Sequence, residues 1–282
     1  MLQKFGLIAL AILATVYLTI CLLLRSQQTK LIFFPNSKIE STPQDYGLDY
    51  QDVWLDIEQE QIHGWWIQAT KASAPAIVYF HGNGSNNGDH SEIAALFYQL
   101  DVSVLLIDYR GYGKSSSIFP NETRVYADAE AAWQYLIQRH IKPEQIFVYG
   151  HSLGGAIAIE LATKHPNMAG LITEGTFTSI QDMASLTPGF RLFPLKWIIT
   201  QPFNSINKIE SLRMPILILH GKKDGVVPSY MSEKLFAAAP QPKQLEIFPL
   251  AGHNNLPELD SEKFLSILRR FMESVHSDLV SS

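Results

Sequence analysis

Cysteine is almost missing from this chain, since Cys21 is the only one among 282 residues. No intramolecular disulfide can form, so the cellular compartment cannot be read from disulfides. A chain of this length can bury enough apolar surface to fold without such cross-links. Internal repeats and low-complexity segments are also absent from the sequence. These absences favour an ordinary globular protein of one or two domains.

Basic clusters are lacking too. Lys and Arg total 22 against 27 Asp and Glu, which gives a net charge of −5. Basic residues are not interleaved with aromatic residues in the way that nucleic-acid-binding surfaces require. We therefore expect no nucleic-acid partner, while the oligomeric state stays open.

One long stretch, residues 5–24, contains neither a charged residue nor proline. Built as a helix, these 20 residues span about 30 Å, which matches the apolar core of a bilayer. Residues 1–27 are thus predicted to form a single-pass membrane anchor. The side of the membrane is undetermined, because Lys4 faces only three basic residues after the stretch, a bias too small for the positive-inside rule.

Two other interpretations of residues 5–24 stay open. A cleaved signal peptide has a shorter apolar region and a small-x-small cleavage site, and no such site follows Leu24. A lipid-modified Cys21 would need a small residue before it, where Ile20 stands. Residues 28–49 are expected to be a linker that either lies in the membrane interface or packs on the globular part, and residues 50–278 form the globular domain.

Apolar runs alternate with helical patterns through this domain. Runs typical of strands buried on both faces are 76–80, 102–107, 145–149, 171–173, 214–220 and 244–248, and helices are expected near 90–100, 125–137 and 261–275. This alternation predicts a largely parallel sheet covered on both sides. Residues 53–57 and 62–67 predict an antiparallel hairpin, with His63 exposed and given no role. Asp108 is expected to pair structurally with Arg110.

The domain is organised around Gly150-His151-Ser152-Leu153-Gly154, between a buried strand and a run of small residues typical of a helix. This is the strand–turn–helix context in which a G-x-S-x-G motif presents a nucleophilic serine. Glycines at the motif's ends remove side chains that a very tight turn would not admit. We predict Ser152 as a nucleophile.

A serine hydroxyl needs a base to take its proton, and an acid to orient that base. His253 follows the last strand and precedes the terminal helix, so it is the candidate base. Asp224 follows the preceding strand and is the candidate acid, although a turn aspartate there could instead bond its own backbone. Glu174, at the end of an earlier strand, is the rival acid.

An acyl-transfer reaction also needs donors for the oxyanion. The backbone N–H of Leu153 follows the serine, and Asn83 lies in the glycine-flanked loop after the first buried strand. These two residues are the predicted oxyanion hole.

The motifs together resemble the α/β-hydrolase superfamily over about residues 50–275, and look closest to its membrane-anchored members, which include acyl thioesterases and serine aminopeptidase-like proteins. The stretches that carry the resemblance are 79–84, 108–115, 152–156 and 252–254. It implies a mostly parallel eight-stranded sheet with helices on both faces, and it implies Ser152, His253 and Asp224 as a catalytic triad. It implies a short lid at residues 175–213. It implies no cofactor and no metal.

The lid is dense in apolar residues, namely Phe190, Leu192, Phe193, Leu195, Trp197, Ile198 and Ile199. They form either ordinary packing over the sheet or an apolar wall for an acyl chain. With the anchor, the second interpretation predicts a membrane-bound serine hydrolase acting on esters or thioesters of lipophilic small molecules or acylated proteins. The alternatives are a serine peptidase of the same fold and a non-catalytic binding protein.

Overall fold

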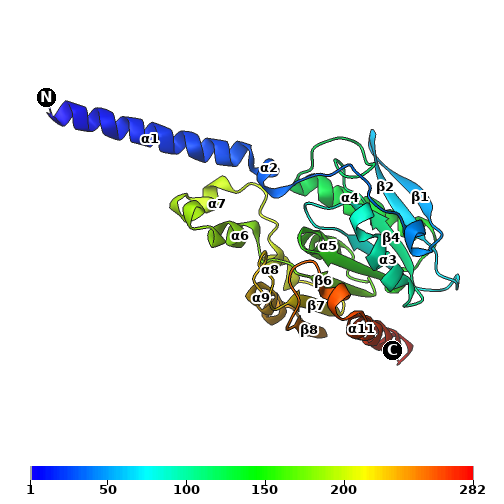
Figure 1. Cartoon of the computed structure of the whole chain (residues 1–282). Helices are drawn as coiled ribbons and strands as arrows, with labels where there is room; N and C mark the ends of the chain where they lie inside the picture. Colours follow the sequence, from blue (N-terminus) through cyan, green and yellow to red (C-terminus); the bar gives the residue numbers. More distant parts are fainter. Residues whose placement is uncertain (1, 282) are drawn as a thin grey trace.

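The computed structural model describes residues 2–281, and its centre is one twisted sheet of eight strands in the order β1-β2-β4-β3-β5-β6-β7-β8 (Figure 1). The first two pairings, β1 with β2 and β2 with β4, are antiparallel, and all the others are parallel. This confirms the predicted α/β-hydrolase sheet. The strands are β1 Gln51–Ile57, β2 Glu60–Ile67, β3 Ala76–Phe80, β4 Ser103–Ile107, β5 Ile146–His151, β6 Gly170–Glu174, β7 Ile216–Gly221 and β8 Lys243–Phe248.

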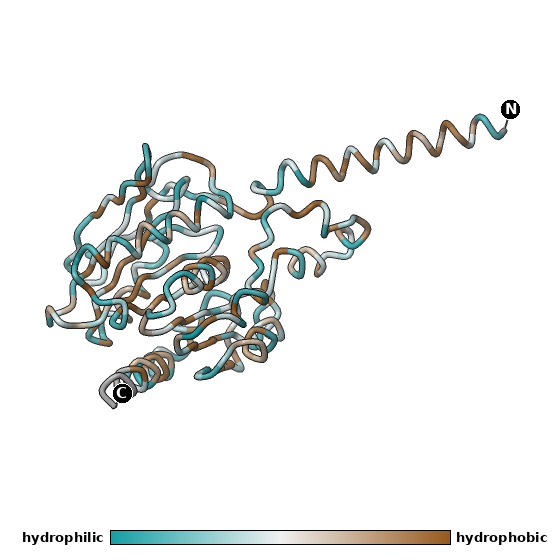
Figure 2. Tube along the Cα trace, turned by 180° about the vertical axis from the view of Figure 1, so that it is seen from behind, coloured by the Kyte–Doolittle hydropathy of each residue, from teal (hydrophilic) through white to brown (hydrophobic). Residues whose placement is uncertain are grey.

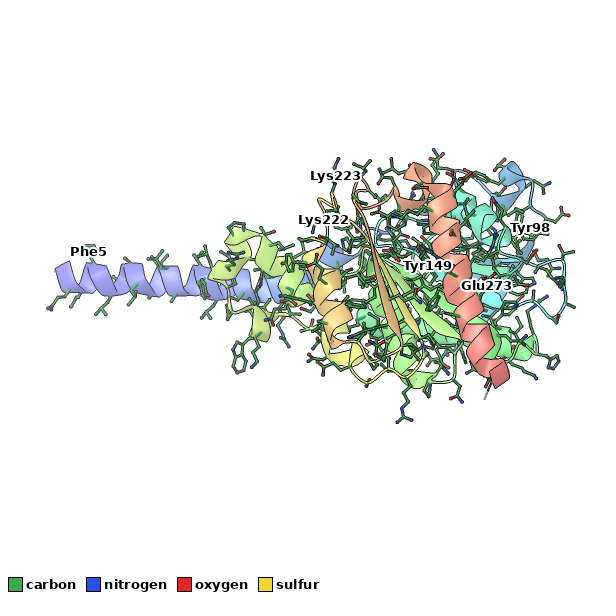
Figure 3. All side chains as sticks on the ribbon, turned by 90° about the horizontal axis from the view of Figure 1, so that it is seen from below. Phe5, Tyr98, Tyr149, Lys222, Lys223 and Glu273 are labelled. Carbon is green, nitrogen blue, oxygen red and sulfur yellow. The ribbon has the colours of Figure 1, made fainter. Side chains whose placement is uncertain are left out.

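Helices cover both faces of the sheet, because its central strands are apolar on each side. One face packs against α4 (Glu122–Gln138), α5 (Leu153–Lys164), α8 (Ser205–Ile209) and α9 (Tyr230–Ala238). The other packs against α3 (Ser91–Tyr98), α10 (Leu256–Leu259) and α11 (Ser261–Ser281), and Figure 3 shows α11 crossing that face. Two apolar cores therefore enclose the sheet and fix the ends of its strands.

The apolar N-terminal stretch forms one helix, α1 (Leu2–Ser26), which projects away from the domain (Figure 2). Its segment Gln3–Ser26 is long and apolar enough to cross a membrane, and none of it is buried inside the protein. By length and composition, the helix fits both a single-pass membrane anchor and a signal sequence.

The chain after α1 divides its apolar side chains between the domain and the solvent. It forms α2 (Gln28–Ile32) and later a 3₁₀ turn, η1 (Pro43–Tyr46). Ile32 and Phe33 are buried in the core, whereas Leu31 and Phe34 are exposed. Ile32 and Phe33 therefore pack on the globular part, whereas Leu31 and Phe34 lie outside the core, where the proposed membrane interface would be.

The lid consists of α6 (Ile180–Leu186), a 3₁₀ turn η4 (Pro188–Leu192) and α7 (Leu195–Ile198). It lies beside the domain end of α1 rather than over the sheet (Figures 1 and 3). Two further 3₁₀ turns lie in loops of the domain: η2 (Asn87–His90) follows β3, and η3 (Pro143–Gln145) precedes β5.

Two expectations about polar residues were wrong. His63 is fully buried rather than exposed, with Nε2 2.6 Å from Asp52 Oδ1. Arg110 pairs with Asp128 at 2.7 Å and with Glu60 at 3.2 Å, and not with Asp108. Asp108 instead accepts a hydrogen bond from the Asn87 N–H. Both errors arise because the partners lie on other elements, which local sequence cannot show.

The Arg110–Asp128 pair generates a stability prediction. Burial raises the pKa of Asp128 to about 6, against the opposing effect of the Arg110 charge. Removing one partner leaves the other buried and unpaired, so Arg110→Met should destabilise the fold by about 3–5 kcal/mol, measured as a lower thermal midpoint. The double variant Arg110→Met/Asp128→Leu should regain most of the loss. A single variant as stable as the parent would contradict the prediction.

Candidate active site

Ser152 lies between the last residue of β5 and the first residue of α5, with φ 54° and ψ −117°. This left-handed backbone is strained for a residue with a side chain, and such strain costs about 1–3 kcal/mol. A Cβ on Gly154 would lie 2.0 Å from the Phe80 carbonyl oxygen, and one on Gly150 would lie 2.3 Å from that of Gly154. The two glycines of the motif are thus required for α5 to pack this close to the sheet.

The structure brings the three predicted residues together. Ser152 Oγ lies 3.0 Å from His253 Nε2, and His253 Nδ1 lies 2.6 Å from Asp224 Oδ2. Their loops follow β5, β8 and β7, three strands whose carboxyl ends lie at one edge of the sheet. This is the arrangement that acyl transfer by a serine requires: a hydroxyl, a base beside it and an acid behind the base.

Asp224 is held rigidly in its turn. Its Oδ1 accepts the backbone N–H groups of Val226 and Val227 at 2.8 Å each, which leaves Oδ2 for the imidazole. Burial raises the pKa of this carboxyl, but hydrogen bonds from His220, His253 and Val227 outweigh burial and hold the pKa well below its usual range. Asp224 is therefore an ionised carboxylate that contacts both the backbone N–H groups of its own turn and the imidazole of His253.

The rival acid, Glu174, faces a different partner. Its carboxylate accepts a hydrogen bond from the hydroxyl of Tyr149, and its backbone carbonyl accepts the Ser152 N–H at 2.8 Å. The next residue, Gly175, has φ +57°, and a Cβ there would lie 3.3 Å from the His253 ring. Glu174 thus supports the serine turn, while Asp224 contacts the imidazole.

The two predicted oxyanion donors come from α5 and from the loop after β3. Leu153 is the first residue of α5, so its N–H has no acceptor within the helix. The carbonyl of Asn83 accepts the Phe34 N–H at 2.9 Å and the Tyr112 hydroxyl at 2.7 Å, and its side chain donates to the Ile32 carbonyl at 2.8 Å. These bonds fix Asn83 while its own N–H donates to no acceptor among the described residues.

Two cavities meet at Ser152 and Asn83. The smaller, about 230 Å³, is apolar and is lined by the lid and by the end of the N-terminal helix, with Leu24, Leu31, Phe177, Met183, Phe190, Leu195 and Ile198 in its wall. The larger, about 510 Å³, has many polar residues in its wall, among them Ser85, His90, His151, Glu174, His253 and Glu258, besides apolar ones such as Ile93 and Leu96. The serine thus stands between an apolar and a polar chamber.

His151, inside the motif, was given no role from sequence. Its Nε2 lies 3.0 Å from the His253 carbonyl oxygen, and the two rings lie 5.0 Å apart. Burial lowers the pKa of His151, so its imidazole is neutral near pH 7. It therefore supports the loop that carries His253 as an uncharged group. His151 occupies a variable position of the motif, so the sequence pattern does not predict its contact with the His253 loop.

Among the side chains that the structure describes, those of residues 3–275, no group of three His, Cys, Asp or Glu gathers as a metal site would require.

Known proteins match this chain in sequence and in fold. A family model, serine aminopeptidase S33, matches residues 71–207 and 204–260. An uncharacterised protein of Mycobacterium tuberculosis is 34% identical over 93% of both chains, and a lysophosphatidylserine lipase of Danio rerio is 30% identical over 79% of this chain and 64% of its own. An esterase of Pyrococcus furiosus superposes with a TM-score of 0.71 at 19% identity, covering 86% of this chain and 98% of the esterase. The family model and the near full-length relative show that the chain belongs to the serine aminopeptidase S33 family of α/β hydrolases.

Proposed function

We propose that the protein is a membrane-anchored serine hydrolase that cleaves carboxylic esters or thioesters of lipophilic acyl substrates. The observation that carries the proposal is the hydrogen-bonded line Asp224–His253–Ser152, which ends at the mouth of an apolar cavity. The related lipase of Danio rerio supports a lipid substrate.

In the proposed reaction, Ser152 Oγ attacks the acyl carbonyl carbon as His253 Nε2 takes the hydroxyl proton. Asp224 holds the imidazole's orientation and stabilises the imidazolium. The oxyanion accepts hydrogen bonds from the N–H groups of Leu153 and Asn83. Collapse breaks the bond to the leaving alcohol or thiol, which receives the proton from His253.

The second half of the reaction regenerates the serine. A water molecule attacks the acyl-enzyme as His253 takes one of its protons. The resulting intermediate collapses, the bond to Ser152 Oγ breaks, the acid is released, and His253 returns the proton to Ser152 Oγ. The apolar cavity suits the acyl chain, because its wall is formed by Leu, Ile, Phe and Met side chains. The polar cavity is left for the leaving group.

Replacing the nucleophile tests the assignment directly. Ser152→Ala should keep the fold and lower the turnover of a short p-nitrophenyl ester by at least about a thousandfold, because no acyl-enzyme can form. A fluorophosphonate probe should label the parent and leave the variant unlabelled. Unchanged turnover would reject Ser152.

The same preparation separates the alternative functions. A pure binding protein would hydrolyse nothing and stay unlabelled. The serine aminopeptidase model keeps a peptidase in view, and faster cleavage of an aminoacyl amide than of a medium-chain acyl ester would favour it.

The acid is tested by comparing two carboxylates. Asp224→Asn should lower kcat by up to about 10⁴-fold, because the amide favours the wrong imidazole tautomer. Glu174→Gln, whose side chain contacts Tyr149 instead, is the matched control and should lose far less. The reverse order of effects would exchange the two assignments.

The anchor is tested by extraction. The full chain should stay with membranes in high salt and leave them only with detergent, because the mostly apolar 24-residue segment Gln3–Ser26 buries too much surface for salt to release. A variant lacking residues 1–27 should be soluble and still cleave the short ester, with weaker activity on long chains because Leu24 leaves the cavity wall. Release of the full chain by salt alone would contradict the membrane span.

A further inference from the structure

Hydrogen bonds and a ring contact join the lid to the N-terminal helix, although the two segments lie far apart in the sequence. The Tyr17 hydroxyl donates to the Leu192 carbonyl at 3.0 Å, and the Tyr17 ring stacks on Phe193 at 5.5 Å. Further along, Arg25 donates to the Trp197 carbonyl at 2.7 Å. Figures 1 and 3 show the lid lying alongside the last turns of α1.

These contacts place the lid at membrane depth if α1 spans the bilayer. Tyr17 precedes Ser26, the last residue of α1, by nine residues, which is about 13 Å along a helix. The apolar core of a bilayer is about 30 Å thick. A lid that touches Tyr17 therefore lies beside a part of α1 that the proposed anchor places within the leaflet.

The lid's surface suits that environment. Leu192 and Trp197 are large apolar side chains, yet they are 75% and 77% exposed. Each follows a basic residue, Arg191 or Lys196. Their backbone carbonyls, which would be costly in lipid without a partner, accept the hydrogen bonds from Tyr17 and Arg25. The helix therefore satisfies polar groups of the lid that water would otherwise have to satisfy.

The charge of this region is opposite to that of the whole chain. Beside the domain end of α1, residues 25–37 contain Arg25 and Lys30 and no acidic residue, and residues 183–200 of the lid contain Arg191 and Lys196 and no acidic residue. The whole chain carries a net charge of −5. Cations beside an apolar surface are the pattern that anionic lipid head groups attract.

A buried amide joins the two elements at the acyl cavity. Gln28 Oε1 accepts the N–H groups of Thr200 and Gln201 at 2.9 and 2.8 Å, and Nε2 donates to the Ile198 carbonyl at 3.2 Å. On the inner side of this clasp, Leu24 from the end of α1 and Leu31 from α2 line the same cavity as Phe190 and Leu195 from the lid. The helix and the lid thus form one wall.

We propose that the lid is a second membrane-inserted element, seated in the leaflet beside α1, and that the acyl cavity receives its lipid directly from that leaflet, preferably one with anionic head groups. The delivery of substrate rests on the function proposed above, whereas the insertion of the lid requires only that α1 spans the membrane.

Tryptophan fluorescence tests the insertion without any turnover. Of the five tryptophans, Trp65, Trp66 and Trp133 are buried in the domain, and Trp54 is 48% exposed on β1, at the edge of the sheet far from α1. Full-length protein in vesicles of brominated phosphatidylcholine should lose part of its emission relative to unbrominated vesicles. Trp54→Phe should keep this quenching, and Trp197→Phe should abolish it.

Absence of quenching in the parent, or quenching that persists in Trp197→Phe, would overturn the insertion of the lid. Because Ser152→Ala protein can be used, this result does not depend on catalysis. Protein that leaves the vesicles in salt would instead overturn the membrane anchor itself.

Activity tests the delivery of substrate. Leu192→Asp places a charge in the leaflet and should lower turnover of a long-chain ester held in vesicles by at least about tenfold, with turnover of a soluble short ester unchanged. Tyr46→Asp, an exposed site on η1, is the control and should change neither. Mixing phosphatidylglycerol into the vesicles should raise the long-chain rate, and Arg191→Gln/Lys196→Gln should remove that gain. Equal loss on both esters, or no dependence on the anionic lipid, would contradict delivery from an anionic leaflet.

Discussion

The strained backbone of Ser152 determines the geometry of the candidate site. Its positive φ turns the chain from β5 into α5 within one residue, so the hydroxyl stands above the sheet and the first N–H of the helix points to the same space. The strain is tolerated because the surrounding structure leaves no alternative. The Ser152 N–H is bonded to the Glu174 carbonyl, and β5 is paired on both sides by β3 and β6. A rigid sheet thereby maintains a conformation that the isolated segment would avoid.

Rigid placement also explains how the side chains around the serine differ in charge. Asp224 keeps its negative charge because three donors face it, whereas His90 and His151 remain neutral because burial lowers their pKa values. The imidazole of His253 thus has one carboxylate behind it and the neutral His151 ring 5.0 Å away. In the proposed reaction, the imidazolium formed at His253 would be stabilised by Asp224 without competition from a positive charge on His151.

Much of this arrangement could be predicted from the sequence, because its signals are local. Six apolar runs marked the parallel strands, and the spacing of Gly150, Ser152 and Gly154 marked the turn between β5 and α5. What could not be predicted depends on partners far along the chain. The buried His63, the Arg110–Asp128 pair and the Gln28 clasp each join elements whose proximity only the fold creates, and Gln28 is about 170 residues from its partners.

The lid shows most clearly that contacts between distant segments cannot be predicted from local sequence. Its apolar residues suggested either core packing or an acyl wall, and the structure divides them: Phe190, Leu195 and Ile198 line the cavity, while Leu192 and Trp197 point away from it. No pattern within residues 175–213 predicts this division, because the surface that separates the two sets is supplied by α1. Gln28, the first residue of α2 and two residues beyond the end of α1, is tied to the lid through buried hydrogen bonds, so the end of α1 cannot shift without changing the shape of the cavity. If a flexible linker joined α1 to the domain, α1 would act only as a tether. In this fold, the end of α1 is instead part of the wall that an acyl chain would contact.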